Sequence, residues 1–141
     1  MSSTCVFCAI AAGDAPARVV AESDGAIAFL DIAPAGEGHT LVIPRSHADD
    51  IWSLSAADAD DVWRLTVRAA ERLRDVLRPD GLTLFQANGE AGWQEVFHFH
   101  MHLVPRWRGD SLIRPWKSVP GDATRLDETS ALLSSDGSPG T

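Results

Sequence analysis

The sequence predicts an α+β domain built on an antiparallel sheet with one long helix. Short apolar segments typical of strands lie on both sides of a long helical pattern that follows Ser55 and runs to about Leu77. Strand segments close together in a chain can pair as hairpins, which favours an antiparallel sheet. At 141 residues the chain is long enough for one domain with a core and too short for two comfortable ones.

The first third of the chain predicts a short helix and two strands. CVFCAIAAGDAP, residues 5–16, is compatible with one or two helical turns that end at Gly13. AIAFLDIAP, residues 26–34, predicts a strand that leads into a turn, and residues 40–43 predict a buried strand that Pro44 ends. The two strands are expected to pair as a hairpin.

The long helix has clear start and stop signals. Ser55 is a good N-cap residue, whereas Pro79 and Gly81 end the helical pattern. Apolar residues recur at helical spacing and form one stripe that can pack on a sheet. They are Val62, Leu65, Ala69, Leu73, Val76 and Leu77.

Two further strands and a polar tail complete the expected order. Residues 82–86 predict a strand, residues 87–95 a loop, and residues 96–104 a strand that carries three histidines. After Pro120 a short helix is expected near residues 127–133, and residues 134–141 have the composition of a disordered tail. The predicted organisation is a domain over residues 1–116 and a C-terminal extension over residues 117–141.

Composition excludes several classes of protein. The formal net charge of −8 argues against a nucleic-acid-binding surface, which needs Lys and Arg to neutralise phosphates. The apolar residues, 45% of the chain, form no run long enough to span a membrane. The N-terminus lacks the pattern of a secretory signal, and two cysteines form no disulfide framework, so a reducing cytoplasm is the expected compartment.

The stretch FHFHMHLVPRW, residues 97–107, predicts a functional strand. Alternation places His98, His100 and His102 on one face, and Phe97, Phe99, Met101 and Leu103 on the other, which reads as a core face. Three imidazoles in register are costly unless the protein uses them. They could bind a metal, or an unmetallated imidazole could attack phosphorus while a neighbour acts as acid or base.

Cys5 and Cys8 form a second candidate site. Cys-x-x-Cys is half of a tetrahedral zinc site, which would need two histidines from elsewhere in the chain. A redox pair is the alternative, although no thioredoxin-like strand precedes the motif.

Taken together, these segments resemble the histidine triad (HIT) family of nucleotide hydrolases and transferases. HFHMHLV matches the family signature His-φ-His-φ-His-φ-φ, where φ is apolar. CVFCAIAAGD, AFLDIAPAGEGHTLVIPRSH and NGEAGWQEVFHFHMHLVPRW stand in the family's order and spacing, so the resemblance covers about residues 5 to 116. It implies an α+β domain whose antiparallel sheet continues across a homodimer.

The resemblance also implies catalytic roles. His100 is similar to the nucleophile that attacks the α-phosphorus and forms a nucleotidyl-histidine. His102 is similar to the residue that meets the phosphate and helps to protonate the leaving group, and His39 to the histidine that supports the site from the neighbouring strand. The expected substrates are purine nucleotides such as AMP conjugates, cleaved by a phosphoramidase or a dinucleoside polyphosphate hydrolase. The alternatives are a nucleotide-binding regulatory module with little turnover and a zinc-dependent interaction domain.

The ligand-binding residues are implied in the same way. Asp31 matches the position that accepts hydrogen bonds from ribose, and Phe7, Ile10, Phe29 and Ile32 resemble the apolar base pocket. Asn88, Gln94, Glu95 and Val96 match the phosphate-contacting loop. Trp93 stands where many relatives have Gly, and Glu95 where some have a hydroxyl residue, so Glu95 can offer only its backbone N–H to phosphate. Cys5, Cys8, His47 and His98 match a structural zinc site, and no organic cofactor is expected.

Overall fold

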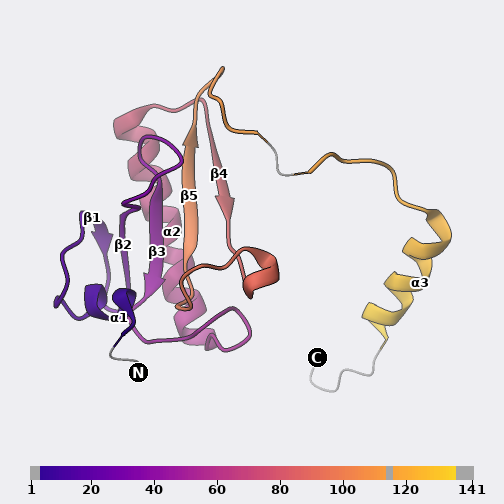
Figure 1. Ribbon diagram of the computed structural model, residues 1–141, viewed down its shortest axis with the longest axis horizontal. Helices are drawn as coiled ribbons and strands as arrows, with labels where there is room; N and C mark the ends of the chain where they lie inside the picture. Colours follow the sequence, from indigo (N-terminus) through magenta and orange to yellow (C-terminus); the bar gives the residue numbers. More distant parts are fainter. Residues whose placement is uncertain (1–3, 114–115, 136–141) are drawn as a thin grey trace. The chain divides into compact units, whose positions relative to one another are not determined.

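A five-stranded antiparallel sheet forms the centre of the compact unit that extends to Asp110 (Figure 1). The computed structural model describes residues 4–113 and 116–135. The strands are β1 (Val19–Glu22), β2 (Ala26–Leu30), β3 (Thr40–Pro44), β4 (Gly81–Phe85) and β5 (Met101–Arg106), in the spatial order β1-β2-β3-β5-β4. The predicted α+β class and the β2–β3 hairpin pairing are confirmed.

Helix α2 (Ala56–Leu77) covers one face of the sheet and is the long helix that the sequence predicts. The Ser55 side chain accepts a hydrogen bond from the amide of Asp58 at 3.1 Å, and Arg78 ends the helix in the left-handed region with φ 55°. Apart from Val76, which is exposed, the predicted stripe packs against the sheet. The core on this face contains Ala26, Ala28, Val42, Val62, Leu65, Ala69, Leu73, Phe99 and Leu103.

Helix α1 (Val6–Ala11) belongs to the core on the opposite face. On β2 and β3, alternate side chains point away from α2 and form a second cluster with Phe7 of α1. They are Ile27, Phe29, Leu41 and Ile43. Because Phe99 and Leu103 belong to the α2 side, the alternating histidines belong to the α1 side. The Phe7 ring accordingly meets the rings of His98 and His100 edge-on.

The histidine strand is shorter than predicted. Strand pairing begins at Met101, opposite Val42, rather than near residue 96. Continued pairing would reach Pro44, which ends β3 and has no N–H to donate. The amide of Phe99 instead donates to the carbonyl of Ala48 at 2.7 Å. Phe97 is 48% exposed, so its expected place in the core is wrong.

Strand β1 is an addition to the predicted elements. Its four residues, VVAE, are too short to give a clear alternation, and they become a strand by pairing with β2. A single 3₁₀ turn, η1 (Glu90–Gly92), interrupts the loop that leads to the histidines.

The second compact unit begins at Ser111 and contains α3 (Ala123–Ser134). This helix is the one expected near residues 127–133, and it begins earlier because the Asp122 side chain caps it. The boundary expected at residue 116 stays a prediction. Most of the expected tail, residues 136–141, lies outside the described residues.

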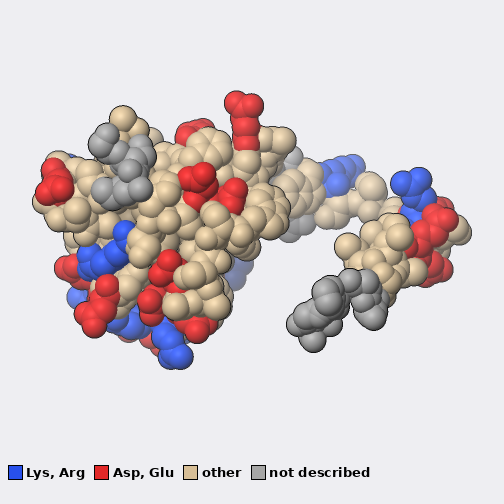
Figure 2. Space-filling view, turned by 90° about the horizontal axis from the view of Figure 1, so that it is seen from below, with Lys and Arg blue, Asp and Glu red and all other residues tan. Residues whose placement is uncertain are grey.

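The surface mixes charges of both signs. On the face in Figure 2, acidic and basic side chains of the first unit lie beside one another rather than in one basic area. Within residues 4–113 and 116–135, no helix has the length and apolar character needed to cross a membrane.

Candidate functional site

His100 is held in one defined tautomer. Its ring is 7% exposed, and its Nδ1 lies 2.7 Å from the carbonyl oxygen of His98. A carbonyl oxygen only accepts, so Nδ1 carries the proton and Nε2 keeps its lone pair. Burial lowers the pKa of His100, which keeps the ring neutral near pH 7. A neutral imidazole with a free Nε2 lone pair is a competent nucleophile.

His39 and His102 form a hydrogen-bonded pair beside His100. The amide of Ala35 donates to Nδ1 of His39 at 2.9 Å, so the His39 proton is on Nε2. That Nε2–H donates to Nδ1 of His102 at 2.9 Å, which leaves the His102 proton on Nε2. The two neighbouring rings of the triad, His100 and His102, therefore offer opposite groups: a lone pair and an N–H donor. Their ring centroids are 4.8 Å apart.

Two other side chains complete the surroundings of this pair. Oδ2 of Asp31 lies 3.6 Å from Nε2 of His39, and Oδ1 of Asp31 accepts from the amide of Ala33. Phe85 of β4 stacks on His102 with ring centroids 4.0 Å apart. Sequence reasoning missed Phe85, because its role depends on the register that pairs Phe85 with His102 across β4 and β5.

The buried imidazoles predict a loss of stability in mild acid. Burial, followed by the charges of His100 and His39, lowers the pKa of His102 from 6.5 to about 4. The unfolded chain therefore binds this proton at a higher pH than the folded one does. Stability is full above pH 6.5 and falls as the pH drops from 6.5 through about 4. Urea unfolding across this window, with zinc in excess, should show a shallower pH dependence for His102→Gln than for the unaltered chain. Equal slopes would contradict the prediction.

The apolar residues expected to form a base pocket lie together with one exception. Phe7 and Phe29 are buried, and Ile10 and Val96 pack against the same cluster. The Phe7 and Phe29 rings meet edge-on with centroids 5.5 Å apart. Ile32, in the turn after Asp31, is 88% exposed and is not part of this cluster. A base-binding role for Ile32 stays a prediction.

The loop over residues 89–96 is held by the side chain of Gln94 within it and by that of Asn88 directly before it. The buried Gln94 side chain accepts from the amide of Gly89 at 2.7 Å and donates to the carbonyls of Asp49 and Val96 at 2.6 and 3.1 Å. Oδ1 of Asn88 accepts from the amide of Ile51 at 2.8 Å. Both side chains are thus engaged with the protein itself. Glu95 is exposed, and its charge opposes only in small part the lowering of the His100 pKa that burial causes.

Four predicted metal ligands meet at one point on the α1 side of the sheet. The ligand atoms of Cys5, Cys8, His47 and His98 all lie within 4.8 Å of one another. Nδ1 of His98 is 3.4 Å from Sγ of Cys5 and 3.5 Å from Sγ of Cys8, and Nδ1 of His47 is 3.3 Å from Sγ of Cys8. Cys5 and Cys8 come together because α1 begins between them, with Cys5 as its N-cap.

The donor set fits a closed tetrahedral zinc site. Two thiolates and two imidazoles are ligands that zinc prefers in structural sites. The outer ring nitrogens are also fixed: Nε2 of His98 donates to the carbonyl of Pro44 at 2.9 Å, and Nε2 of His47 lies 2.7 Å from Oδ1 of Asp49. Such partners orient metal-bound imidazoles in zinc proteins. Four protein ligands would leave no open position on the ion, which is typical of structural rather than catalytic zinc sites.

Known proteins share the fold of this chain. A HIT family protein from Bacillus anthracis matches this structure with a TM-score of 0.85 and 34% identity, covering 94% of this chain and 96% of that one. A zinc-bound histidine triad family protein from Mycobacterium smegmatis matches with a TM-score of 0.74 and 35% identity, covering 89% of this chain and 97% of that one.

A relative with a named activity is also similar in sequence. Adenosine 5′-monophosphoramidase hnt1 of Schizosaccharomyces pombe is 37% identical over 103 residues, which are 73% of this chain and 74% of the relative. The HIT domain matches residues 12–109, a stretch that contains His39, all three histidines of the triad and the loop before them. The chain belongs to the HIT domain family.

Proposed function

We propose that this protein is a nucleotide hydrolase that cleaves purine nucleotides at the α-phosphate through a nucleotidyl-histidine intermediate. The observation that carries the proposal is the hydrogen bonding of His100 and His102, from which opposite tautomers of the two rings follow. An Nε2 lone pair beside an Nε2–H donor suits attack on a phosphate whose oxygens need a hydrogen bond. Likeness to a relative named as a phosphoramidase supports a P–N bond as the bond cleaved.

The chemistry proceeds in two balanced steps. Nε2 of His100 attacks the α-phosphorus, and the bond from phosphorus to the amine breaks. The negative charge of the bound phosphate favours uptake of one proton from solvent by the His39–His102 pair, close to the carboxylate of Asp31. To hold this proton the pair gives up either the hydrogen bond from the Ala35 amide or the hydrogen bond between the two rings. That proton goes to the leaving amine. Water then attacks the nucleotidyl-histidine, returns a proton to the pair and releases AMP.

The nucleotide would lie between the apolar cluster and the phosphate loop. Phe7, Ile10 and Phe29 would pack on the base, and Asp31 would accept hydrogen bonds from the ribose hydroxyls. Because the Gln94 and Asn88 side chains are engaged within the protein, we assign phosphate contact to the backbone N–H groups of Glu95 and Val96. Phosphate binding by backbone donors also suits a chain with a net charge of −8.

The choice of leaving group can be tested directly. An AMP–amine conjugate is expected to be hydrolysed faster than a diadenosine polyphosphate, and acid-free quenching should trap adenylate on His100, identified by peptide mass. Absence of turnover on both substrates, with AMP still bound and no adenylated histidine, would contradict hydrolysis. That outcome would favour the alternative, a nucleotide-binding module with little turnover.

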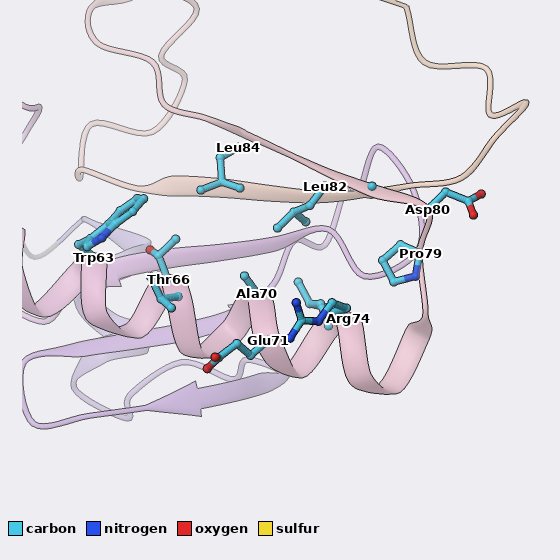
Figure 3. Close-up of a pocket in the computed structure, with 12 residues that line it drawn as sticks. Trp63, Thr66, Ala70, Glu71, Arg74, Pro79, Asp80, Leu82 and Leu84 are labelled. Atoms are coloured by element: carbon cyan, nitrogen blue, oxygen red, sulfur yellow. The ribbon is translucent and has the colours of Figure 1, made fainter.

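We also propose that the protein is a homodimer joined at β4. This strand is one of the two edges of the sheet, the other being β1, and it includes Leu84, which is 37% exposed. A groove of about 560 Å³ lies beside it. Figure 3 shows that Trp63 and Thr66 of α2 face Leu82 and Leu84 across this groove. A second copy would pair its own β4 with this edge, extend the antiparallel sheet and cover the groove.

The dimer predicts a measurable mass. Sedimentation of the full chain at micromolar concentration should give twice the mass of 15.2 kDa, and Leu84→Lys should shift the protein toward one copy. A charged side chain at this edge would be buried against its own copy in the dimer. A single-copy mass for the unaltered chain would contradict the proposal.

A further inference from the structure

We propose that Gln94 is a positioning residue through which occupancy of the Cys5/Cys8/His47/His98 site sets the geometry of the phosphate loop. The phosphate loop is here residues 89–96. This inference rests on the proposed function, which assigns phosphate binding to that loop. It extends the proposal from the residues that touch the nucleotide to the residue that fixes the loop's position.

The metal site and the phosphate loop are both connected to one short segment of chain, residues 47–51. Residues 47–51 begin with a metal ligand, His47. They lie beside a second stretch, residues 88–100, which carries the phosphate loop, His98 and His100. Three hydrogen bonds join the two stretches. The amide of Phe99 donates to the carbonyl of Ala48 at 2.7 Å, Nε2 of Gln94 donates to the carbonyl of Asp49 at 2.6 Å, and the amide of Ile51 donates to Oδ1 of Asn88 at 2.8 Å.

Gln94 is the centre of this connection. Its buried side chain binds residues 47–51 at Asp49 and both ends of the phosphate loop, at Gly89 and Val96. The same Asp49 accepts, through Oδ1, the Nε2–H of His47 at 2.7 Å. One residue therefore contacts the metal ligand by its side chain and Gln94 by its carbonyl. A displacement of His47 would therefore move the Asp49 carbonyl to which Gln94 donates.

The metal site closes the same two stretches that Gln94 joins. His47 begins one stretch and His98 lies near the end of the other, and their rings meet edge-on with centroids 5.0 Å apart. Coordination of both imidazoles by one ion would lock the ends of the two stretches together. Without the ion, residues 47–51 are still held by the packing of the buried Ala48 and by hydrogen bonds, each of modest net strength, so the phosphate loop should open more often.

Amide hydrogen exchange on the full chain tests the connection without a nucleotide. Peptides that cover residues 89–96 should exchange about ten times faster after zinc is removed with a chelator, whereas β2 and β3, although the whole domain is then less stable, should still exchange more slowly than the loop. Zinc-loaded Gln94→Met, which keeps the size of the side chain and loses its hydrogen bonds, should show the same fast exchange with full zinc stoichiometry. Glu90→Gln, at an exposed position of the same loop, is the matched control and should behave like the unaltered chain.

AMP binding supplies the second measurement. Thermodynamic linkage requires that, if zinc strengthens AMP binding about tenfold, AMP strengthens zinc binding by the same factor. The unaltered chain should show this reciprocal change, and Gln94→Met should show neither. Unchanged exchange of residues 89–96 after zinc removal or in Gln94→Met overturns the inference, as does equal AMP affinity with and without zinc. If no form binds AMP, the proposed function fails, and hydrogen exchange still decides the role of Gln94.

Discussion

Replacement of His100 by alanine is expected to lower kcat/KM for an AMP–amine conjugate by about four orders of magnitude, because loss of a covalent nucleophile removes the step that the other groups assist. The expectation rests on the Nδ1–H of His100, which is fixed by the carbonyl of His98 and leaves Nε2 as the attacking atom. Steady-state hydrolysis of the conjugate by purified protein measures the effect.

His102→Ala is the graded comparison for this experiment. Loss of a hydrogen-bond donor and proton donor should cost about 10² to 10³ in kcat/KM and should leave His100 open to adenylation. Added imidazole should restore part of the activity of His100→Ala, because the small molecule can occupy the space of the lost ring. More than one hundredth of the original activity in His100→Ala, with no imidazole effect, would show that another group attacks phosphorus.

Alternation along one strand predicts that His100 and His102 lie on the face opposite Phe99 and Met101, and this prediction holds. The separate roles proposed for His100, His102 and His39 do not follow from that pattern and rest on the resemblance to the HIT family. The proton positions could not be predicted in this way. They depend on the carbonyl of His98 and the amide of Ala35, whose directions are set by backbone geometry where the strand has not yet begun.

The fold likewise has features that local sequence predicts and features that depend on pairing with distant segments. Helix α2 was predictable because Ser55 and Pro79 mark its ends and its apolar spacing is regular. Strand β1 and the late start of β5 depend on which neighbours remain available for pairing, and a single segment does not carry that information. Gln94 shows the same limit at the site: a Gln beside a phosphate loop suggests a ligand contact, whereas its buried amide holds the loop to Asp49.

Removal of zinc is expected to lower the melting temperature of the protein by about 15 °C. A ligand that binds only the folded chain stabilises it by about 4 kcal/mol when its free concentration is about 1,000 times Kd, and a unit of this size loses about 4 °C for each kcal/mol. Zinc should bind the site strongly because its four ligand atoms already lie together, and the outer nitrogens of both imidazoles are held by Pro44 and Asp49. Calorimetry with and without a chelator measures the shift.

Cys8→Ser separates loss of the metal from other effects of the chelator. The Cys8 side chain is buried between His47 and His98, so a serine hydroxyl of similar size should keep the packing while it weakens zinc binding. The variant should melt close to the zinc-free unaltered chain and should not respond to added zinc. His39→Gln, which alters the catalytic face and leaves the four ligands in place, should keep one zinc per chain and its zinc-dependent rise in melting temperature. If the unaltered chain melts at the same temperature with and without zinc, these four residues do not form a stabilising metal site.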